Sequence, residues 1–144
     1  MNTFSVSVLS PERQVAKAEC TEAIIPTEMG VIAVLPNHAP LATILKSGAV
    51  ELKQKDGKSL FVAVTGGFAT VEENTLTLLT DFAARDDEID EKLVRAAKAQ
   101  AEKTLEELKH EPDLAKARTE LLRASLQLDL LNKHHRGHHT SPTP

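Results

Sequence analysis

The apolar residues of this 144-residue chain change their spacing near Asp86, and this change constrains the fold more than any other feature. Before Asp86, apolar and polar residues alternate in short segments that Gly, Pro and Asp interrupt. After it, apolar residues recur at helical spacing in two runs separated by Pro112. A period of two residues is typical of half-buried strands, and a period of 3.6 is typical of helices. We therefore predict a β + α chain, with an N-terminal β-sandwich (a flattened barrel) followed by a C-terminal antiparallel two-helix hairpin.

Turn and capping residues set the boundaries of the predicted parts. The sandwich is expected at residues 1–84, and the hairpin at 85–133 with helices at about 88–109 and 113–133. The acidic residues at 86–88 and Asp113 are expected to cap the two helices, and Pro112 to end the first. Residues 134–144 are predicted to form a disordered, histidine-rich tail.

Two hairpin turns are predicted inside the sandwich. The dipeptide D-G at residues 56–57 lies between alternating runs, which is a strong hairpin signal because Gly tolerates positive φ. The tripeptide E-E-N at residues 72–74 also separates two alternating runs. Short strands divided by such turns are typical of a sandwich or barrel.

Composition excludes several classes of function. The net charge of −4 and the 3% aromatic content, without Trp or Tyr, disfavour binding to nucleic acid. No apolar run approaches the roughly 20 residues that span a bilayer, and no signal peptide is recognised. Cys20 is the only cysteine, which excludes an intramolecular disulfide. These features indicate a soluble protein of a reducing compartment.

No catalytic or metal-binding constellation stands out, so we expect a protein that is not an enzyme. Gly66-Gly67 is not followed by the Gly-Lys-Ser/Thr that completes a phosphate loop. The pair is better explained as glycines at a place where strands bend or pack closely. His38 has no Cys, Asp or Glu at ligand spacing and is expected in a turn. Cys20 is expected to be a buried or idle thiol, and the acidic residues at 86–88 to be helix caps rather than cation ligands.

The tail is the least ordinary segment. It holds a histidine-rich tract similar to a metal chelator. We expect this segment to be a disordered tail that binds metal only adventitiously. The four histidines are His134, His135, His138 and His139.

Several motifs, in order, resemble one family. The segment G-V-I-A-V-L-P-N-H-A-P-L at residues 30–41 closely resembles the G-x-L-G-I-L-P-G-H-A-P-L pattern of the epsilon subunit of bacterial-type (F-type) rotary ATP synthases. V-L-S-P-E-R at 8–13, V-T-G-G-F at 64–68 and A-R-T-E-L at 117–121 resemble further stretches of that family. The resemblance covers residues 3–133.

The resemblance implies a role as a central-stalk (rotor) subunit, peripheral to the cytoplasmic face of the bacterial inner membrane. The sandwich of such subunits binds the gamma subunit and rests on the ring of c subunits, and it helps to couple proton flow to ATP synthesis. The hairpin restrains ATP hydrolysis and, when extended, meets the alpha and beta catalytic subunits.

The same resemblance implies which residues contact partner subunits, by their positions in the matching motifs. In the hairpin, Lys116, Arg118 and Arg123 would contact the catalytic subunits. The residues that would face the c ring are Glu28, Val31, Asn37, His38, Ala39 and Pro40.

Some family members bind ATP on the folded hairpin through the motif I/L-D-x-x-R-A. Ile89 and Asp90 match its start, but Leu93 and Val94 occupy the Arg-Ala positions. Arg95 comes two residues late, which rotates it by about 200° around a helix. We therefore expect weak or no ATP binding and no cofactor.

Two other classes of function remain as alternatives. A free-standing adaptor or chaperone-like module would use the hairpin to bind clients, and would not sediment with membranes in a large ATPase. An enzyme acting on a small molecule would need an acid, base or nucleophile pair at useful spacing, and the sequence has none.

Overall fold

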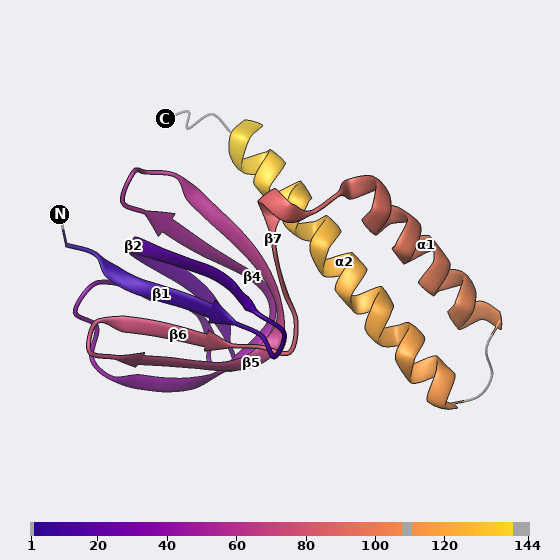
Figure 1. The fold of residues 1–144 in the computed structure, drawn as a ribbon, viewed down its shortest axis with the longest axis horizontal. Helices are drawn as coiled ribbons and strands as arrows, with labels where there is room; N and C mark the ends of the chain where they lie inside the picture. The colour runs from indigo at the N-terminus through magenta and orange to yellow at the C-terminus, as the bar shows by residue number, and fades with distance from the viewer. Residues whose placement is uncertain (1, 108–110, 140–144) are drawn as a thin grey trace. The chain divides into compact units, whose positions relative to one another are not determined.

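The computed structural model describes residues 2–107 and 111–139, and the chain divides into two compact units, Met1–Asp86 and Asp87–Pro144. The first unit is a β-sandwich and the second contains two helices, so the predicted fold class is confirmed (Figure 1). The strands of the first unit are β1 (Phe4–Leu9), β2 (Gln14–Thr27), β3 (Gly30–Val34), β4 (Leu41–Gln54), β5 (Ser59–Glu72), β6 (Thr75–Leu79) and β7 (Ala83–Arg85).

The strands form one sheet that closes on itself. Its order is β1-β6-β5-β4-β2-β3, and β1 also pairs with β2, which closes a flattened barrel. The pairing of β1 with β6 is parallel, whereas all the other pairings of the sheet are antiparallel. β3 continues the sheet beyond β2, and β7 pairs with part of β5. The closure leaves few strand edges open to unwanted pairing.

Alternating side chains build the barrel core. In β1, Phe4, Val6 and Val8 are buried while the serines between them are partly exposed. Each large apolar side chain buried in this way contributes about 1.5–3 kcal/mol. The core also includes, among others, Ile25, Val34, Val50, Leu52, Val62, Val64, Leu76 and Leu78.

Both predicted hairpins are confirmed. Gly57 has φ +88° in the turn between β4 and β5. Glu73 and Asn74 join β5 to β6 with φ of 49° and 58°. Two consecutive residues with positive φ match the twist of the flanking strands, so this turn is tight although it contains no Gly.

Three strands differ from the sequence prediction. β2 runs without a break through Pro26, although proline at this point predicts the end of a strand. Its pairing with β4 is irregular between Ile24 and Thr27, so the missing N–H of Pro26 lies at an irregular part of the ladder. β5 joins two predicted strands through the pair Gly66-Gly67. β7 was not predicted, because three residues carry too little periodicity to recognise.

The second unit begins with a 3-10 turn at Asp86–Glu88, followed by α1 (Glu91–Glu107) and α2 (Glu111–His139). The prediction that residues 86–88 cap α1 is wrong: the cap is Asp90, which directly precedes the helix. Pro112 lies in the first turn of α2, where a missing N–H costs no helical hydrogen bond, so the helix begins before the predicted cap at Asp113.

The end of α2 also differs from the prediction. The backbone at 134–139 is helical and continues α2 to His139, because nothing before this point stops a helix more strongly than a single Gly. The helix therefore extends beyond the predicted boundary at residue 133, whereas residues 140–144 lie outside the described residues, and the disorder of the tail stays a prediction. The expected end of the first helix at 108–109 also lies outside them.

α1 and α2 lie side by side and antiparallel within their unit (Figure 1). Apolar residues spaced alternately three and four apart predict a buried seam on the second helix, and its members Ala117, Ala124 and Leu128 are buried. Helical spacing likewise predicts a buried stripe on α1 through Ile89, Leu93, Ala97 and Ala101. This prediction is wrong at Leu93 and Ala97, which are exposed, and Val94 is buried instead. Within the described residues, neither helix is long and apolar enough to cross a membrane.

Candidate functional site

A rigid turn between β2 and β3 presents apolar side chains. The Thr27 hydroxyl donates a hydrogen bond to the Gly30 carbonyl at 2.6 Å and accepts one from the Met29 N–H at 3.2 Å. These bonds satisfy the buried Thr27 side chain and fix the turn. Met29 and Val31 are therefore held in an exposed position, at 88% and 72% exposure. We call these two residues the turn tip.

The turn tip adjoins a row of exposed apolar side chains on the barrel. Ile44 of β4 is directly opposite Phe68 of β5, and Phe68 is directly opposite Leu79 of β6. All three are exposed, Phe68 at 60%. The Glu28 N–H donates to the Ile44 carbonyl at 3.1 Å, which ties the turn to the end of this row. We call Ile44, Phe68 and Leu79 the apolar row.

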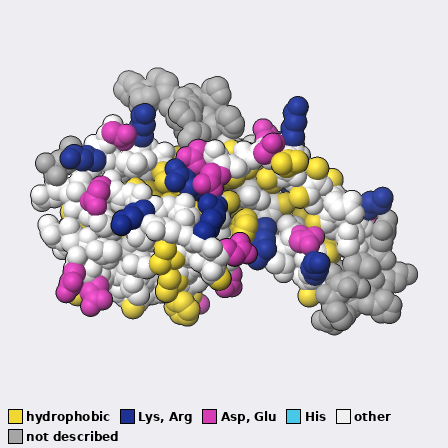
Figure 2. Space-filling view, viewed as in Figure 1, with side chains coloured by type: hydrophobic (Ala, Val, Ile, Leu, Met, Phe, Trp, Pro, Cys, Tyr) yellow, Lys and Arg dark blue, Asp and Glu magenta, His cyan; other side chains and the backbone are white. Residues whose placement is uncertain are grey.

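A shallow pocket extends the apolar row. Its volume is about 390 Å³, and Phe68 and Leu79 form part of its wall together with Leu9 and Pro11 at the end of β1. Figure 2 shows that hydrophobic side chains reach the surface in patches between charged ones. Exposed apolar surface of this kind is typical of sites where another protein binds.

A second exposed turn lies at the other end of β3. Asn37 has φ 62°, and its N–H donates to the Asn74 Oδ1 at 2.7 Å. The Asn74 Nδ2 donates in turn to the Thr3 carbonyl at 2.9 Å. The His38 Nδ1 lies 2.7 Å from the Ala39 carbonyl, a local contact of a turn histidine, as the sequence predicted.

The predicted c-ring residues therefore fall into two groups. Glu28 and Val31 lie where β3 begins, and residues 37–40 lie beyond its end. That Asn74 supports the second group could not be predicted from the sequence, because Asn74 is 37 residues from Asn37 and reaches it only in the folded chain. The apolar row was also missed, since its members come from three different strands.

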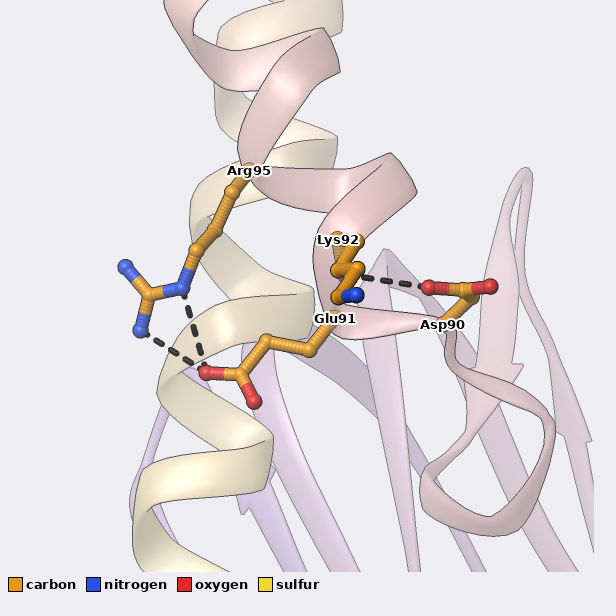
Figure 3. A network of polar contacts seen from close by, with 4 residues as sticks. All are labelled: Asp90, Glu91, Lys92 and Arg95. Atoms are coloured by element: carbon orange, nitrogen blue, oxygen red, sulfur yellow. Dashed lines mark hydrogen bonds and ion pairs between the residues drawn. The ribbon is translucent and has the colours of Figure 1, made fainter.

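The start of α1 is fixed by two local interactions (Figure 3). The Asp90 Oδ1 accepts hydrogen bonds from the N–H groups of Lys92 and Leu93, at 3.0 and 3.3 Å. The Glu91 Oε1 accepts two bonds from the Arg95 guanidinium, at 3.1 and 2.8 Å, which is the pairing that the i,i+4 spacing of these two residues on a helix predicts.

These interactions decide where the three candidate ATP-binding residues lie. Ile89 is half-buried and packs against the cluster of Val94, Ala124 and Leu128. Asp90 is the helix cap, and Arg95 is paired with Glu91. In Figure 3 the Asp90 carboxylate and the Arg95 guanidinium lie on opposite sides of the start of α1, so the structure does not bring them together.

The three basic residues predicted to contact catalytic subunits are exposed on α2. Lys116 and Arg123 are seven residues apart and share one side of the helix. Arg118 lies about 200° around the helix from Lys116, on the other side of the buried seam. They therefore form two separate charged edges rather than one patch.

Cys20 belongs to the barrel core and is fully buried. Burial and, to a smaller extent, the nearby Glu19 carboxylate together raise the pKa of its thiol to about 11. The thiolate needed for nucleophilic chemistry is therefore scarce at neutral pH. Among the side chains that the structure describes, no group of three His, Cys, Asp or Glu residues is placed to hold a metal ion.

Comparison with solved structures agrees with the architecture. A chain of the Euglena gracilis mitochondrial ATP synthase (OSCP/F1/c-ring, rotational state 1) matches with a TM-score of 0.62 and 18% identity, over 96% of this chain and 83% of that chain. A chain of the Tetrahymena thermophila mitochondrial ATP synthase central stalk and c-ring matches with a TM-score of 0.51 and 18% identity, over 88% and 95%. The fold thus defines a class of proteins that join a small β-sandwich to a two-helix unit.

Sequence comparison gives the family within that class. Residues 3–86 match the family described as ATP synthase, Delta/Epsilon chain, beta-sandwich domain, and residues 87–132 match its long alpha-helix domain. The chain is 38% identical over 133 residues to the ATP synthase epsilon chain of Verminephrobacter eiseniae (92% of this chain, 96% of that one). It is also 38% identical over 134 residues to that of Polaromonas naphthalenivorans (93% and 97%). The chain belongs to the ATP synthase delta/epsilon family, as an epsilon-type chain.

Proposed function

We propose that this chain is a rotor subunit of a proton-translocating ATP synthase, where it couples proton flow to ATP synthesis without catalysing a reaction itself. The observation that carries this proposal is the match of both units, along nearly the whole chain, to the two parts of the delta/epsilon family. The proposed location is peripheral, at the cytoplasmic face of the bacterial inner membrane. The first test is whether the chain sediments with membranes in an ATPase complex; a free-standing adaptor would not.

The sandwich is proposed to bind two partners through different surfaces. The apolar row and its pocket suit a protein partner that covers them permanently, for which we propose the gamma subunit. The turn tip with Glu28, and the second turn at residues 37–40, are proposed to meet the c ring. The turn-tip loop is internally hydrogen-bonded, so it can bind with little loss of conformational entropy.

Three single substitutions test the proposed gamma-subunit contact and the proposed c-ring contact separately. Phe68→Ser should weaken binding to the isolated gamma subunit by about 2 kcal/mol or more, as expected for an aromatic anchor. Val31→Ser should leave gamma binding intact and weaken attachment to the c ring. Leu93→Ser is the matched control, since Leu93 is as exposed as Phe68 but lies on α1. If Leu93→Ser weakens gamma binding as much as Phe68→Ser, the apolar row is not the gamma contact.

The helical unit is proposed to restrain ATP hydrolysis by contacting the alpha and beta subunits. The proposal rests on the family resemblance and on the two exposed basic edges of α2. Such contacts are individually modest and sensitive to salt. The test compares ATP hydrolysis by the complex with the whole chain and with a chain that ends after Asp86. Faster hydrolysis after truncation supports the restraint, whereas unchanged hydrolysis leaves only the coupling role of the sandwich.

The two basic edges can then be tested separately. The double variant Lys116→Ala with Arg123→Ala removes one edge, and Arg118→Ala removes the other. Faster hydrolysis from only one of these variants identifies the edge that meets the catalytic subunits. If neither variant changes hydrolysis while truncation does, the restraint acts through apolar contacts instead.

We further propose that the hairpin does not bind ATP. The support is that Asp90 serves as the helix cap and that Arg95 is paired with Glu91 on the other side of the helix start. Calorimetric titration of the isolated chain with ATP should show no binding at micromolar concentrations. A micromolar dissociation constant would overturn this proposal.

A further inference from the structure

The second turn, at residues 37–40, begins with a type II β-turn. The His38 N–H donates a hydrogen bond to the Leu35 carbonyl at 3.2 Å. Between these two residues, the ring of Pro36 holds φ at about −65° and Asn37 has φ 62°. A negative φ followed by a positive φ defines a type II turn, whose own hydrogen bond uses the N–H of the fourth residue. The N–H of Asn37, the third residue, is therefore available to an acceptor outside the turn.

Asn74 supplies that acceptor from a distant part of the chain. Its Oδ1 accepts the bond from the Asn37 N–H at 2.7 Å, and its Nδ2 donates to the Thr3 carbonyl at 2.9 Å. The main-chain carbonyl of Asn74 also accepts a bond from the Ser5 N–H, at 3.2 Å. A short side chain that accepts on one side and donates on the other must be an amide. Asn74 thus ties the second turn to the start of β1.

The sheet register sets the position of this amide. Glu72 of β5 is directly opposite Thr75 of β6, so Glu73 and Asn74 form a two-residue loop, in which both have positive φ. Asn tolerates this backbone conformation better than most residues. The Asn74 side chain is exposed, so it contributes to the structure through its hydrogen bonds and not through apolar packing.

We propose that Asn74 is a positioning residue for the c-ring contact. Its amide holds the second turn in the orientation in which residues 37–40 meet the c ring, and it acts through Asn37 without touching the ring itself. This inference rests on the proposed function, which assigns these residues to that contact. It differs in its consequence, because a substitution remote from the contact in sequence should weaken attachment to the c ring while leaving the gamma contact intact.

Four single substitutions in the full chain test the role of Asn74. Asn74→Gly removes both side-chain bonds and accepts the positive φ without strain. Asn74→Asp keeps an acceptor for the Asn37 N–H but has no donor for the Thr3 carbonyl. Glu73→Gly is the matched control, because Glu73 lies in the same loop, is exposed and also has positive φ. Ala39→Glu adds a charge to the second turn and so tests the c-ring contact directly.

Three quantities are measured for each variant. The first is affinity for the isolated gamma subunit. The second is attachment of the complex with gamma to membranes that retain the c ring but have been stripped of the alpha, beta and gamma subunits. The third is hydrogen exchange of the Asn37 amide, followed by nuclear magnetic resonance.

Asn74→Gly should weaken attachment to the c ring about fivefold, which is about 1 kcal/mol, as expected for the loss of one hydrogen bond that orders the turn. Exchange of the Asn37 amide should become faster by a similar factor. Asn74→Asp should keep this amide protected and weaken attachment less than Asn74→Gly. Affinity for gamma should not change in any of these variants, and Glu73→Gly should leave all three quantities unchanged.

Different results would overturn the proposal in distinguishable ways. If Asn74→Gly leaves attachment unchanged while Ala39→Glu abolishes it, the second turn meets the c ring but does not depend on Asn74. If neither variant changes attachment, the proposed c-ring contact of residues 37–40 fails as well. Equal weakening of gamma binding and c-ring attachment by Asn74→Gly would show a general loss of structure instead of positioning. Unchanged exchange of the Asn37 amide would show that the bond to Asn74 does not hold the turn.

Discussion

At the scale of single residues, two glycines with positive φ differ in the space that surrounds them. Gly57 has φ +88° at a turn, and a Cβ atom added there would meet nothing within 4 Å. Gly67 has φ +132° inside β5, and a Cβ there would overlap the backbone carbonyl of Leu79. Gly67 thus allows β5 and β6 to approach closely just beside Phe68 of the apolar row.

We expect Gly67→Ala to lower the free energy of unfolding by at least about 3 kcal/mol, since backbone strain and overpacking add together. Gly57→Ala is the matched control and should cost only the strain, about 1–2 kcal/mol. Urea unfolding of the two variants measures the difference. Equal losses would mean that the contact with Leu79 relaxes without cost.

Cys20 should react slowly with alkylating reagents in the folded protein. Its pKa is raised from 9.0 to about 11, which lowers the thiolate fraction at neutral pH by about 100-fold. Burial of the sulfur slows the reaction further. The measurement compares rates of alkylation at pH 7.5 in buffer and in denaturant. The folded thiol also ionises less readily than the unfolded one, so stability should fall as pH rises from about 9 towards 11.

At the scale of elements, the helical unit depends on its first turn. Asp90 satisfies two N–H groups that the helix cannot, and its negative charge lies near the positive end of the helix dipole. The hydrogen-bonded pair of Glu91 and Arg95 adds only about 0.3–0.5 kcal/mol, because both side chains are exposed. The cap is therefore the stronger of the two interactions.

Asp90→Ala should destabilise α1 by about 1 kcal/mol, because it removes the cap. Asp90→Asn should retain most of the stability, since its amide oxygen accepts the same hydrogen bonds. Hydrogen exchange of the Lys92 and Leu93 amides reports the change directly. Unchanged protection of these amides in Asp90→Ala would contradict the assignment of the cap.

The elements that could be predicted from sequence are those with local causes. The turn at Gly57 follows from the dipeptide itself, and the seam of α2 follows from its helical spacing. The start of α1 could not be placed as well, because Asp86, Asp87 and Asp90 are all chemically suitable caps. The full length of β5 could not be predicted either, because Gly66-Gly67 resembles a break between two strands when the partner strands are unknown.

The candidate site was less predictable than the fold. The family resemblance supplied Glu28, Val31 and residues 37–40, but not the support that Asn74 gives to Asn37. The apolar row consists of Ile44, Phe68 and Leu79, which become neighbours only through strand register. A single sequence does not give register, so a surface shared by three strands has no local signal.

At the scale of the whole molecule, the two units have unequal cores. The sandwich core runs from Phe4 to Ala83 and lies entirely within the first unit. Among the side chains that the structure describes, the buried cluster of the helical unit is small: Val94, Ala124 and Leu128, with Ile89 packed against it. The sandwich therefore has most of the hydrophobic stabilisation available to the chain.

We expect a fragment of residues 1–86 to fold by itself with one cooperative thermal transition. A fragment of residues 87–144 should show weak, non-cooperative helix, because helices with so small a shared core are marginal in water. Circular dichroism melting of both fragments provides the measurement. If the first fragment shows no cooperative transition, the sandwich core is not sufficient without the helices.

The parallel pairing of β1 with β6 also has a consequence for the nascent chain on the ribosome. β1 ends at Leu9, but the strand that covers its second edge is complete only at Leu79. At roughly 5–20 residues per second, the intervening 70 residues take roughly 4–14 s to synthesise. For that time β1 can pair with β2 on one side only, and its other edge is open to wrong partners. The serines that alternate with the apolar residues give β1 one polar face. We therefore expect the unpaired strand to aggregate less readily during translation than a strand that is apolar on both faces.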